Sequence, residues 1–434
     1  MSKRNSFVTT APRLAAFTGL CLILAAGCGN KKKEGDPGSP GSSAAGDKAG
    51  GDKAGGDSAM PGVTATEIKI GQSMPYSGPA SAYGVIGKSE AAYFKMINDK
   101  GGINGRKVNL ISLDDAYNPA KAVEQTRKLV ENEGVAFIFG SVGTANNTAI
   151  QKYLNDKKVP QLFIATGADK WADPTNNPWT IGWQPSYRTE AKIYARYVLK
   201  EKPGAKMCVL YQNDDFGKDY LTGLKDGLAD QYDKIVIKTA SYETSDPTID
   251  SQIVTLQGAG CDTLLTAATP KFGAQAIRKV ADLGWKPMHF VSNVSVSLAA
   301  VLKPAGLDKS TGIITGQYLK DPNDPKAAND PGINEYKAFI KDHLSDVDPN
   351  DGNALYGFSV SGSLVKLLTA CGNDLSRANI MKQAAAIQKQ VVNTLVDGIE
   401  INTAANDFRP ISQMRLAKFN GTSFEPMGDL ISAD

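Results

Sequence analysis

The segment 140–146, Gly-Ser-Val-Gly-Thr-Ala-Asn, places hydroxyl and backbone donors between an apolar strand pattern and a helical pattern. We expect its N–H groups and the hydroxyls of Ser141 and Thr144 to point into a cleft. A helix N-terminus attracts anions because its first N–H groups have no partner within the helix. The pattern therefore indicates a carboxylate site, although an ordinary N-cap by Thr144 explains it equally well.

A second set of donors follows the next apolar run, 161–164, in the sequence Ala-Thr-Gly-Ala-Asp. Its members are Thr166, Gly167, Ala168 and Asp169. The carboxyl ends of neighbouring parallel strands meet at one edge of a sheet, where open α/β folds bind their ligands. Two adjacent strand ends with hydroxyl and backbone donors strengthen the prediction of a carboxylate site.

The sequence offers no catalytic constellation. Its two histidines, His289 and His343, lie far apart and lack neighbours typical of a zinc site. No Walker sequence, nucleophile elbow, His-Glu-x-x-His motif or complete dinucleotide fingerprint is present. Asp114-Asp115 and Asp214-Asp215 follow strands and are acid–base or metal-ligand candidates, but solvated turn and N-cap residues explain them better. We predict a protein without enzyme activity, metal or cofactor.

Three of the five cysteines, Cys208, Cys261 and Cys371, lie beyond the N-terminal region. A Cys208–Cys261 disulfide would suit an oxidising compartment if the two strands that carry these residues are neighbours. The odd count and the apolar strand positions favour free, buried thiols instead.

The N-terminus is typical of a secretion signal. Three basic residues, Lys3, Arg4 and Arg13, precede an apolar run from Leu14 to Ala26. The sequence Leu-Ala-Ala-Gly stands directly before Cys28. This run is shorter than the roughly 20 apolar residues of a transmembrane helix. The segment resembles the lipobox of bacterial lipoproteins, which implies a signal peptide over 1–27, lipidation of Cys28 and an extracytoplasmic protein anchored to a bacterial membrane, in the periplasm or at the cell surface.

After Cys28 we expect a flexible linker followed by the folded part of the protein, and the mature protein has no net charge. Residues 28–62 are rich in Gly, Ser, Ala, Lys and Asp, so we expect a disordered linker with a span of roughly 30 Å. The chain has 48 basic and 45 acidic residues, and the segment 1–27 contains three basic and no acidic ones. The mature protein is therefore neutral, which argues against a nucleic-acid binder.

From residue 64 onward, strand and helix patterns alternate, which predicts parallel sheets covered on both faces. The length suits two domains. Strands are expected at 67–71, 107–113, 135–139, 161–164, 206–211, 234–239, 262–268 and 288–291. Helices are expected at 82–98, from 118 through 130, and at 187–200, 216–228, 249–257 and 272–283. We predict two doubly wound α/β lobes that face each other across a cleft.

Several motifs resemble the branched-chain amino acid binding proteins of ABC transporters, which are type I periplasmic binding proteins. They are Ile-Lys-Ile-Gly at 68–71, Ser-Gly-Pro at 77–79, Tyr83-Gly84, the run 98–105, Asp114-Asp115, Asn118-Pro119 and the run 211–217. The resemblance covers nearly all of 64–420. It implies three crossover strands near 181–185, 313–318 and 393–400, a first lobe of 64–182 plus 316–394, and a second of 183–315 plus 395–434.

The resemblance also implies a ligand site, with departures from the family pattern. Thr144 conforms to the family's carboxylate-binding hydroxyl, but Asp169 stands where another hydroxyl is expected. Asn293 lies in the loop that carries the family's acid for the ligand ammonium, so that acid is missing. Phe216 and Thr269 stand at positions that are commonly aromatic. Tyr83, Tyr117, Phe216 and Trp183 are candidates for stacking against the ligand.

These features predict a small ligand with a carboxylate, an amino acid or an aromatic or other organic acid, captured between the lobes. Because Asn293 is neutral, we expect an acid without an α-ammonium, unless Asp169 has taken over the ammonium role. The resemblance implies a monomer that delivers its ligand to an ABC permease and ATPase complex. A ligand-sensing envelope protein that uses the same cleft without transport is the alternative.

The anchor gives the first test. Cys28→Ala should leave the protein unprocessed or release it from the membrane fraction, because the thiol that carries the lipid is gone, whereas Cys21→Ala should do neither. Membrane fractionation followed by mass measurement checks this. A Cys28→Ala protein that is processed and stays membrane-bound would refute the lipid anchor.

Overall fold

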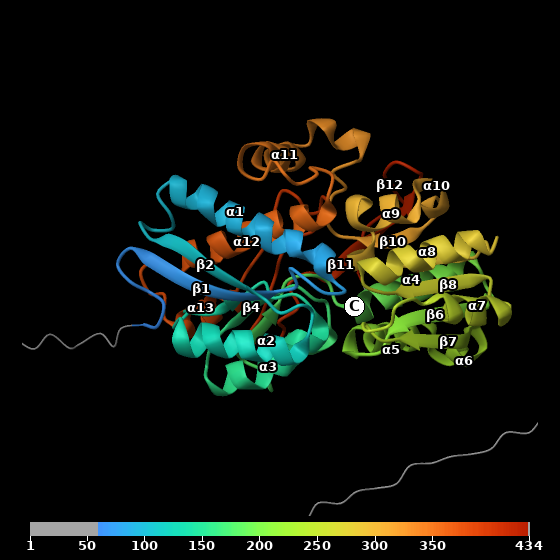
Figure 1. Cartoon of the computed structure of the whole chain (residues 1–434), viewed down its shortest axis with the longest axis horizontal. Coiled ribbons are helices and arrows are strands. Elements are labelled where there is room, and N and C mark those ends of the chain that lie inside the picture. Colours follow the sequence, from blue (N-terminus) through green and yellow to red (C-terminus); the bar gives the residue numbers. More distant parts are fainter. Residues whose placement is uncertain (1–59, 433–434) are drawn as a thin grey trace, which may run out of the picture. The chain divides into compact units, whose positions relative to one another are not determined.

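The computed structural model describes residues 60–432, which form two α/β lobes, each built around its own sheet (Figure 1). The expected signal peptide, Cys28 and all but the last residues of the expected linker lie outside the described residues. Among residues 60–432, no helix is both long and apolar enough to cross a membrane.

The first sheet is parallel, with strand order β2-β1-β3-β4-β5. Its strands are β1 (Glu67–Met74), β2 (Lys107–Asp114), β3 (Ile138–Phe139), β4 (Gln161–Ile164) and β5 (Thr180–Gly182). Helices α1 (Gly84–Asp99) and α12 (Gly352–Ala370) cover one face, and α2 (Pro119–Arg127) and α3 (Thr144–Asp156) cover the other (Figure 1). The two residues of β3 point to opposite faces of the sheet. Phe139 packs on Phe94 of α1, and Ile138 packs with α2 and α3.

The second sheet has strand order β12-β11-β10-β9-β8-β6-β7, with β13 paired to β11. Five strands run parallel: β6 (Met207–Gln212), β7 (Val236–Tyr242), β8 (Thr263–Ala267), β9 (Met288–Val291) and β10 (Ile314–Gln317). The C-terminal segment adds antiparallel β11 (Gln413–Phe419), β12 (Phe424–Pro426) and β13 (Ile431–Ser432).

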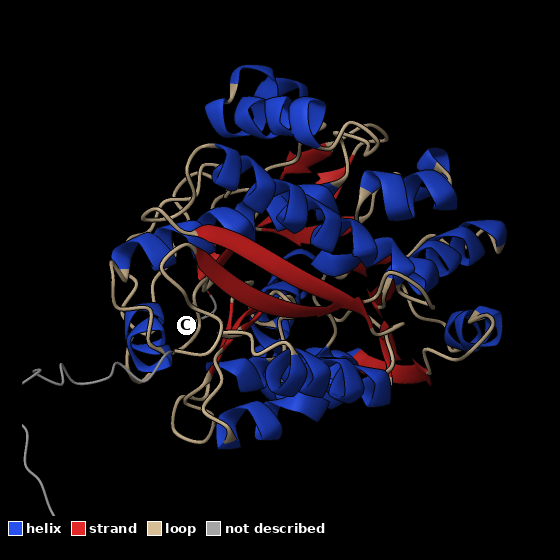
Figure 2. Cartoon of the chain, turned by 60° about the vertical axis from the view of Figure 1, so that its left-hand side comes forward, coloured by secondary structure: helices blue, strands red, loops and turns tan. Residues whose placement is uncertain are grey.

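Helices cover both faces of the second sheet, because neighbouring residues of β6 pack against different helices. Figure 2 shows this kind of layering for the long red strands at the front of the molecule, which lie between blue helices. In β6, Val209 packs with residues of α4 (Tyr187–Glu201) and α5 (Asp215–Leu228), while Leu210 packs with α7 (Asp250–Gly258) and α8 (Pro270–Asp282). Successive side chains of a strand point to opposite faces, so a strand buried on both faces is apolar throughout. This explains the continuous apolar runs in the sequence.

Three connections join the sheets at the positions that the resemblance implies, and together they give the type I periplasmic binding protein fold. The crossover strand expected near 393–400 is wrong, however, because that segment consists of turns with one isolated bridge at Leu395. The first leads from β5 to α4, the second follows β10, and the third leads from α13 (Arg377–Ala384) to β11. The second and third connections are hydrogen-bonded to each other: Val396 N–H donates to the Tyr318 carbonyl at 2.8 Å and Lys320 N–H donates to the Thr394 carbonyl at 2.9 Å.

Most element predictions are confirmed, with differences at the ends and in the connections. Asn118 caps α2 as its sequence indicates, accepting from Ala120 N–H at 2.9 Å and Lys121 N–H at 3.1 Å, with Pro119 at the first helical position. The strand expected from residue 234 begins at Val236, after the short helix α6 (Tyr232–Ile235). The sequence patterns also did not single out α9 (Lys303–Ala305), α10 (Leu307–Ser310), α11 (Pro331–His343), α12 and α13, or the C-terminal strands β11 to β13.

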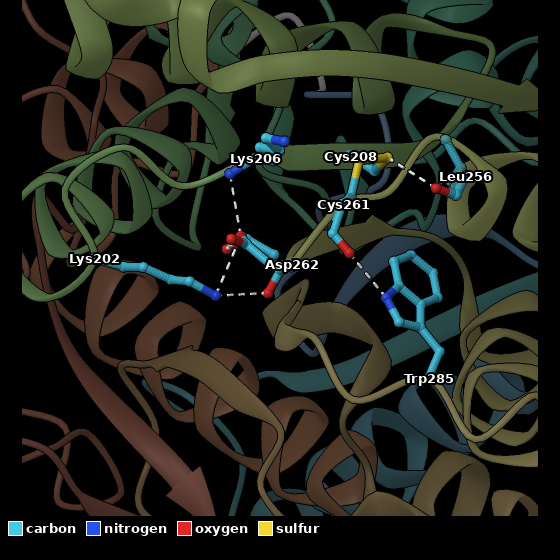
Figure 3. Close-up of a disulfide and its surroundings, with 8 residues drawn as sticks. Lys202, Lys206, Cys208, Leu256, Cys261, Asp262 and Trp285 are labelled. Atoms are coloured by element: carbon cyan, nitrogen blue, oxygen red, sulfur yellow. Dashed lines mark hydrogen bonds and ion pairs between the residues drawn. A yellow bond between two sulfur atoms is a disulfide. The ribbon is translucent and has the colours of Figure 1, made fainter.

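The expectation of free thiols at Cys208 and Cys261 is wrong, because they form a disulfide (Figure 3). Cys208 lies in β6 and Cys261 precedes β8, which pairs directly with β6, although β7 comes between them in the chain. The surrounding hydrogen bonds hold this loop, with Trp285 Nε1 donating to the Cys261 carbonyl at 2.9 Å (Figure 3). Cys371 is free and buried, as predicted.

Removing the disulfide should destabilise the second sheet. The bridge joins residues separated by 53 positions, and the loss of such a constraint on the unfolded chain costs about 2–4 kcal/mol. We expect Cys208→Ser with Cys261→Ser to unfold at lower denaturant concentration than the wild type. Thiol labelling of the denatured wild type should find two more thiols after reduction than before. An equal number of thiols would contradict the bridge.

Candidate functional site

A cavity lies where the carboxyl ends of strands from both sheets face each other. Its volume is about 140 Å³, close to the roughly 150 Å³ of an engineered protein cavity that holds benzene. Residues that line it include Tyr83, Ile86, Tyr117, Val142, Gly143, Thr144, Ala165, Thr166, Gln184, Tyr187, Phe216, Thr269, Asn293, Val294, Gly316, Tyr318 and Tyr356. The strand-end position and the mixture of lining groups are typical of a small-molecule site.

The first-lobe wall carries the hydroxyl pair that the sequence indicates. Thr144 Oγ1 lies 2.5 Å from Thr166 Oγ1, and both side chains are buried. Thr144 is the first residue of α3, so unpaired backbone donors lie beside it. The N-cap is Gly143 and has no side-chain cap, so the alternative of an N-cap by Thr144 is wrong. Gly143 has φ +100°, and a Cβ there would lie 2.6 Å from the Tyr117 ring.

Four of the predicted site residues do not line the cavity. Ser141 Oγ accepts from Ser73 N–H at 3.1 Å, the Gly167 carbonyl accepts from Tyr187 N–H at 2.7 Å, and Ala168 is buried. Asp169 starts a short 3-10 helix and is not among the cavity-lining residues, because its carboxylate is bound by other side chains. It accepts from Ser186 Oγ at 2.8 Å and lies 3.4 Å from the Arg188 guanidinium. Lys170 pairs with Asp215, not with Asp169.

The second-lobe wall brings together three other predicted residues. Phe216 follows the α5 N-cap Asp214, Thr269 caps α8 with its backbone, and Asn293 lies in a 3-10 turn after β9. Tyr83, on the first lobe, donates through its hydroxyl to the Val294 carbonyl at 2.9 Å. This bond links the two walls directly.

The two aspartate pairs singled out in the sequence, Asp114-Asp115 and Asp214-Asp215, contain both turn residues and a core residue. Asp214 accepts from Gly217 N–H at 3.3 Å as an N-cap. Asp115 is fully buried, which corrects the expectation of a solvated residue, and it accepts from Ser73 Oγ at 2.7 Å and Tyr117 N–H at 2.8 Å. Desolvation raises the pKa of Asp115. Among residues 60–432, no group of histidine, cysteine and acidic side chains is arranged to hold a metal ion.

The sequence did not single out three tyrosines that line the cavity: Tyr318, just after β10, Tyr356 in α12, and Tyr187 at the start of α4. Tyr318 and Tyr356 line the cavity, and their rings lie 6.2 and 5.2 Å from Trp183, which itself packs behind them. Tyr187 lines the cavity and contacts Phe216 edge to face at 4.8 Å. The sequence feature that could have identified Tyr187 as a site residue is its position at the start of the helix that follows the first connection.

Comparison with known proteins identifies the family. Residues 67–423 match the family model described as periplasmic binding protein. The chain belongs to the periplasmic binding protein family.

A curated relative and two solved structures agree with this. The Leu/Ile/Val-binding protein homolog 3 of Brucella melitensis is 27% identical over 227 residues, which are 51% of this chain and 60% of that relative, so the match spans less than two thirds of its length. A branched-chain amino acid ABC transporter structure from Thermus thermophilus with bound valine has a TM-score of 0.76 at 16% identity, covering 85% of this chain and 97% of that one.

The second structure is an ABC transporter solute-binding protein from R. palustris in complex with benzoate. It has a TM-score of 0.70 at 20% identity and covers 84% of this chain and 98% of that one. The matched family and relatives are binding proteins, which supports binding as the role of this chain, and family membership implies an extracytoplasmic location.

In this periplasmic binding protein, polar contacts between residues outside the cavity lining also join the two lobes. The backbone N–H of Asp169, after β4, donates to the Asp219 carboxylate of α5 at 2.8 Å, and Lys170 pairs with Asp215 at 3.1 Å. Desolvation, the largest cause, together with Asp169 and Asp215, raises the pKa of Asp219 to about 7. This carboxyl therefore changes charge near neutral pH.

The raised pKa of Asp219 predicts a pH-dependent stability. The folded protein holds this proton more tightly than the unfolded chain, so the stabilisation is complete below about pH 4 and is lost as the pH rises through about 7. The melting temperature of the wild type relative to Asp219→Asn should be higher at pH 5 than at pH 8. The exposed Asp233→Asn is the control. A constant difference between the two pH values would disprove this account of Asp219.

Proposed function

We propose that this protein is an extracytoplasmic substrate-binding lipoprotein. It captures a small ligand with a carboxylate group between its lobes and delivers it to an ABC importer made of a permease and an ATPase. The observation that carries the proposal is the cavity between the two sheets, with the Thr144 and Thr166 hydroxyls at the start of α3 on one wall. Cys28 anchors the protein, which acts as a monomer.

A carboxylate suits the first-lobe wall because its groups are donors. Two hydroxyls and the unpaired N–H groups of the first turn of α3 meet there, and hydrogen bonds to an ionised acceptor are stronger than those between neutral groups. Lys320 also lines the cavity, but it is paired with Asp330 at 2.6 Å and Asp397 at 2.9 Å. The ligand charge is thus met by dipoles and not by a free cation.

The remaining wall suits a compact apolar group. Ile86, Val142 and Val294 supply aliphatic surface, and Tyr117 and Phe216 supply ring faces. A cavity of about 140 Å³ is large enough to hold a benzene-sized group. Valine and benzoate, the ligands bound in the two solved structures, are small carboxylates of this size, which supports an amino acid or an aromatic or other organic acid.

The domain boundaries follow the three connections. We propose a first lobe of residues 64–182 plus 316–394 and a second of 183–315 plus 395–434, with the correction that Gly316 and Gln317 belong to β10 and therefore to the second lobe. The first sheet and the second sheet would then move as two bodies, since hinge closure around a ligand is a common motion of two-lobed binding proteins. Tyr83, Asp169 and Lys170 would make their contacts to the second lobe on closure.

The decisive experiment is a ligand screen followed by calorimetry. Leucine, valine, benzoate and a panel of organic acids should include at least one compound that raises the melting temperature, because a ligand that binds only the folded state stabilises it. Thr144→Ala should weaken its binding by about 1–3 kcal/mol, the cost of leaving a ligand group unsatisfied.

The matched control is Thr148→Ala. Thr148 lies one helical turn further along α3, contacts Lys170 and is not among the cavity-lining residues, so its loss should leave the affinity unchanged. A screen in which no carboxylate binds would overturn the proposed function. Equal weakening by both substitutions would show that Thr144 acts through the helix and not on the ligand.

A further inference from the structure

Glu190 is a fully buried carboxylate directly behind the second-lobe wall of the cavity. It lies in the first turn of α4 and has no exposed surface. A Cβ added to Gly316, which lines the cavity, would lie 3.2 Å from Glu190 Cγ. One layer of backbone thus separates this acid from the ligand space.

Four donors converge on the Glu190 carboxylate, two on each oxygen. Oε1 accepts from the Tyr194 hydroxyl and from Asn293 N–H, the latter at 2.9 Å. Oε2 accepts from the Tyr220 hydroxyl at 2.5 Å and from the Asn293 side-chain amide nitrogen. Burial raises the pKa of Glu190, and these hydrogen bonds act in the opposite direction.

The hydrogen bonds determine which way the Asn293 amide points. An ionised carboxylate only accepts, so the Asn293 Nδ2 group must face Glu190 and the Oδ1 atom is the amide atom left for the cavity. The backbone N–H of Asn293 is held by the same carboxylate, so both the main chain and the side chain are positioned. Tyr194 links this cluster to β10, because its hydroxyl accepts from Gly316 N–H at 2.8 Å.

We propose that Glu190 fixes the amide of Asn293 with its oxygen toward the cavity, so that the ligand presents a hydrogen-bond donor, a hydroxyl or an ammonium group, to this wall. The inference rests on the proposed function and deepens it. One wall then offers donors to a carboxylate, and the other offers an acceptor backed by a buried negative charge. Glu190 is a positioning residue and does not contact the ligand.

The polarity of the two walls gives a specificity rule. A ligand without a donor leaves Oδ1 buried without a partner, and a site built to hydrogen-bond a ligand group rejects an analogue that lacks it. Because the cavity is small, the donor and the carboxylate must lie within a few atoms of each other. Hydroxy acids and amino acids of compact shape fulfil both conditions.

The test compares ligands that differ only in the donor, measured by calorimetry on the full mature protein. One series is benzoate with 2-, 3- and 4-hydroxybenzoate, and the other is 4-methylpentanoate with 2-hydroxy-4-methylpentanoate and leucine. In at least one series a donor-bearing member should bind at least ten-fold more tightly than the member without a donor. A preferred hydroxy acid identifies the donor as a hydroxyl, and preferred leucine identifies it as an ammonium; both support the proposal.

Variants assign the preference to these residues. Asn293→Ala removes the acceptor, and Glu190→Gln replaces one accepting oxygen by a donor, so each should reduce the ratio of affinities to within two-fold. Thr144→Ala is the matched control, because it acts on the carboxylate shared by all ligands and should leave the ratio unchanged. Circular dichroism checks folding, and Asn293→Ala decides the question alone if Glu190→Gln does not fold.

Two results would overturn the inference. If carboxylates bind, but ligands with and without a hydrogen-bond donor bind equally well, the proposed function is supported and the acceptor role of Asn293 is wrong. The same holds if Asn293→Ala keeps the wild-type ratio. If no carboxylate in either series binds, the proposed function itself fails.

Discussion

The packing of Trp183 holds the first connection against the second connection and against the first lobe, next to the cavity. Its indole nitrogen donates to Ser363 Oγ of α12 at 2.9 Å, and its ring contacts Tyr318 and Tyr356 edge to face. One residue thus ties the first connection to the second and to the longest helix of the first lobe. The cavity-lining faces of Tyr318 and Tyr356 depend on this contact, because a large ring with no exposed surface leaves its neighbours little freedom.

Hydrophobic periodicity was sufficient to predict the layered α/β fold. Strands covered on both faces are apolar throughout, and caps such as Asn118-Pro119 mark helix starts locally. The order of the strands within a sheet cannot be predicted from such local patterns. The Cys208–Cys261 bridge requires β8 to lie beside β6, with β7 at the edge, and no local pattern states that order. The short helices between β9 and β10 are likewise set by packing and not by propensity.

The candidate site was partly predictable for the same reason. Thr144, Thr166, Phe216, Thr269 and Asn293 follow strands or begin helices, and such positions meet at the carboxyl edge of a sheet. Asp169 has a similar sequence position but turns toward Ser186, because a 3-10 turn redirects the chain. Glu190 could not be predicted as a site residue, because its position in the sequence suggests an exposed side chain. A charged residue in the amphipathic pattern 187–200 resembles a solvated position, and only the approach of Tyr194, Tyr220 and Asn293 buries it.

The two walls share a principle of construction. Asp115 in the first lobe and Glu190 in the second are both fully buried, and each holds the backbone N–H of a cavity-lining residue, Tyr117 and Asn293 respectively. A buried charge is tolerated only when hydrogen bonds satisfy it, and a satisfied polar network is rigid. Placing the acids one layer behind the wall therefore orients the ligand-facing groups before the ligand arrives. The ligand meets fixed dipoles instead of mobile ions, so less ordering is needed on binding.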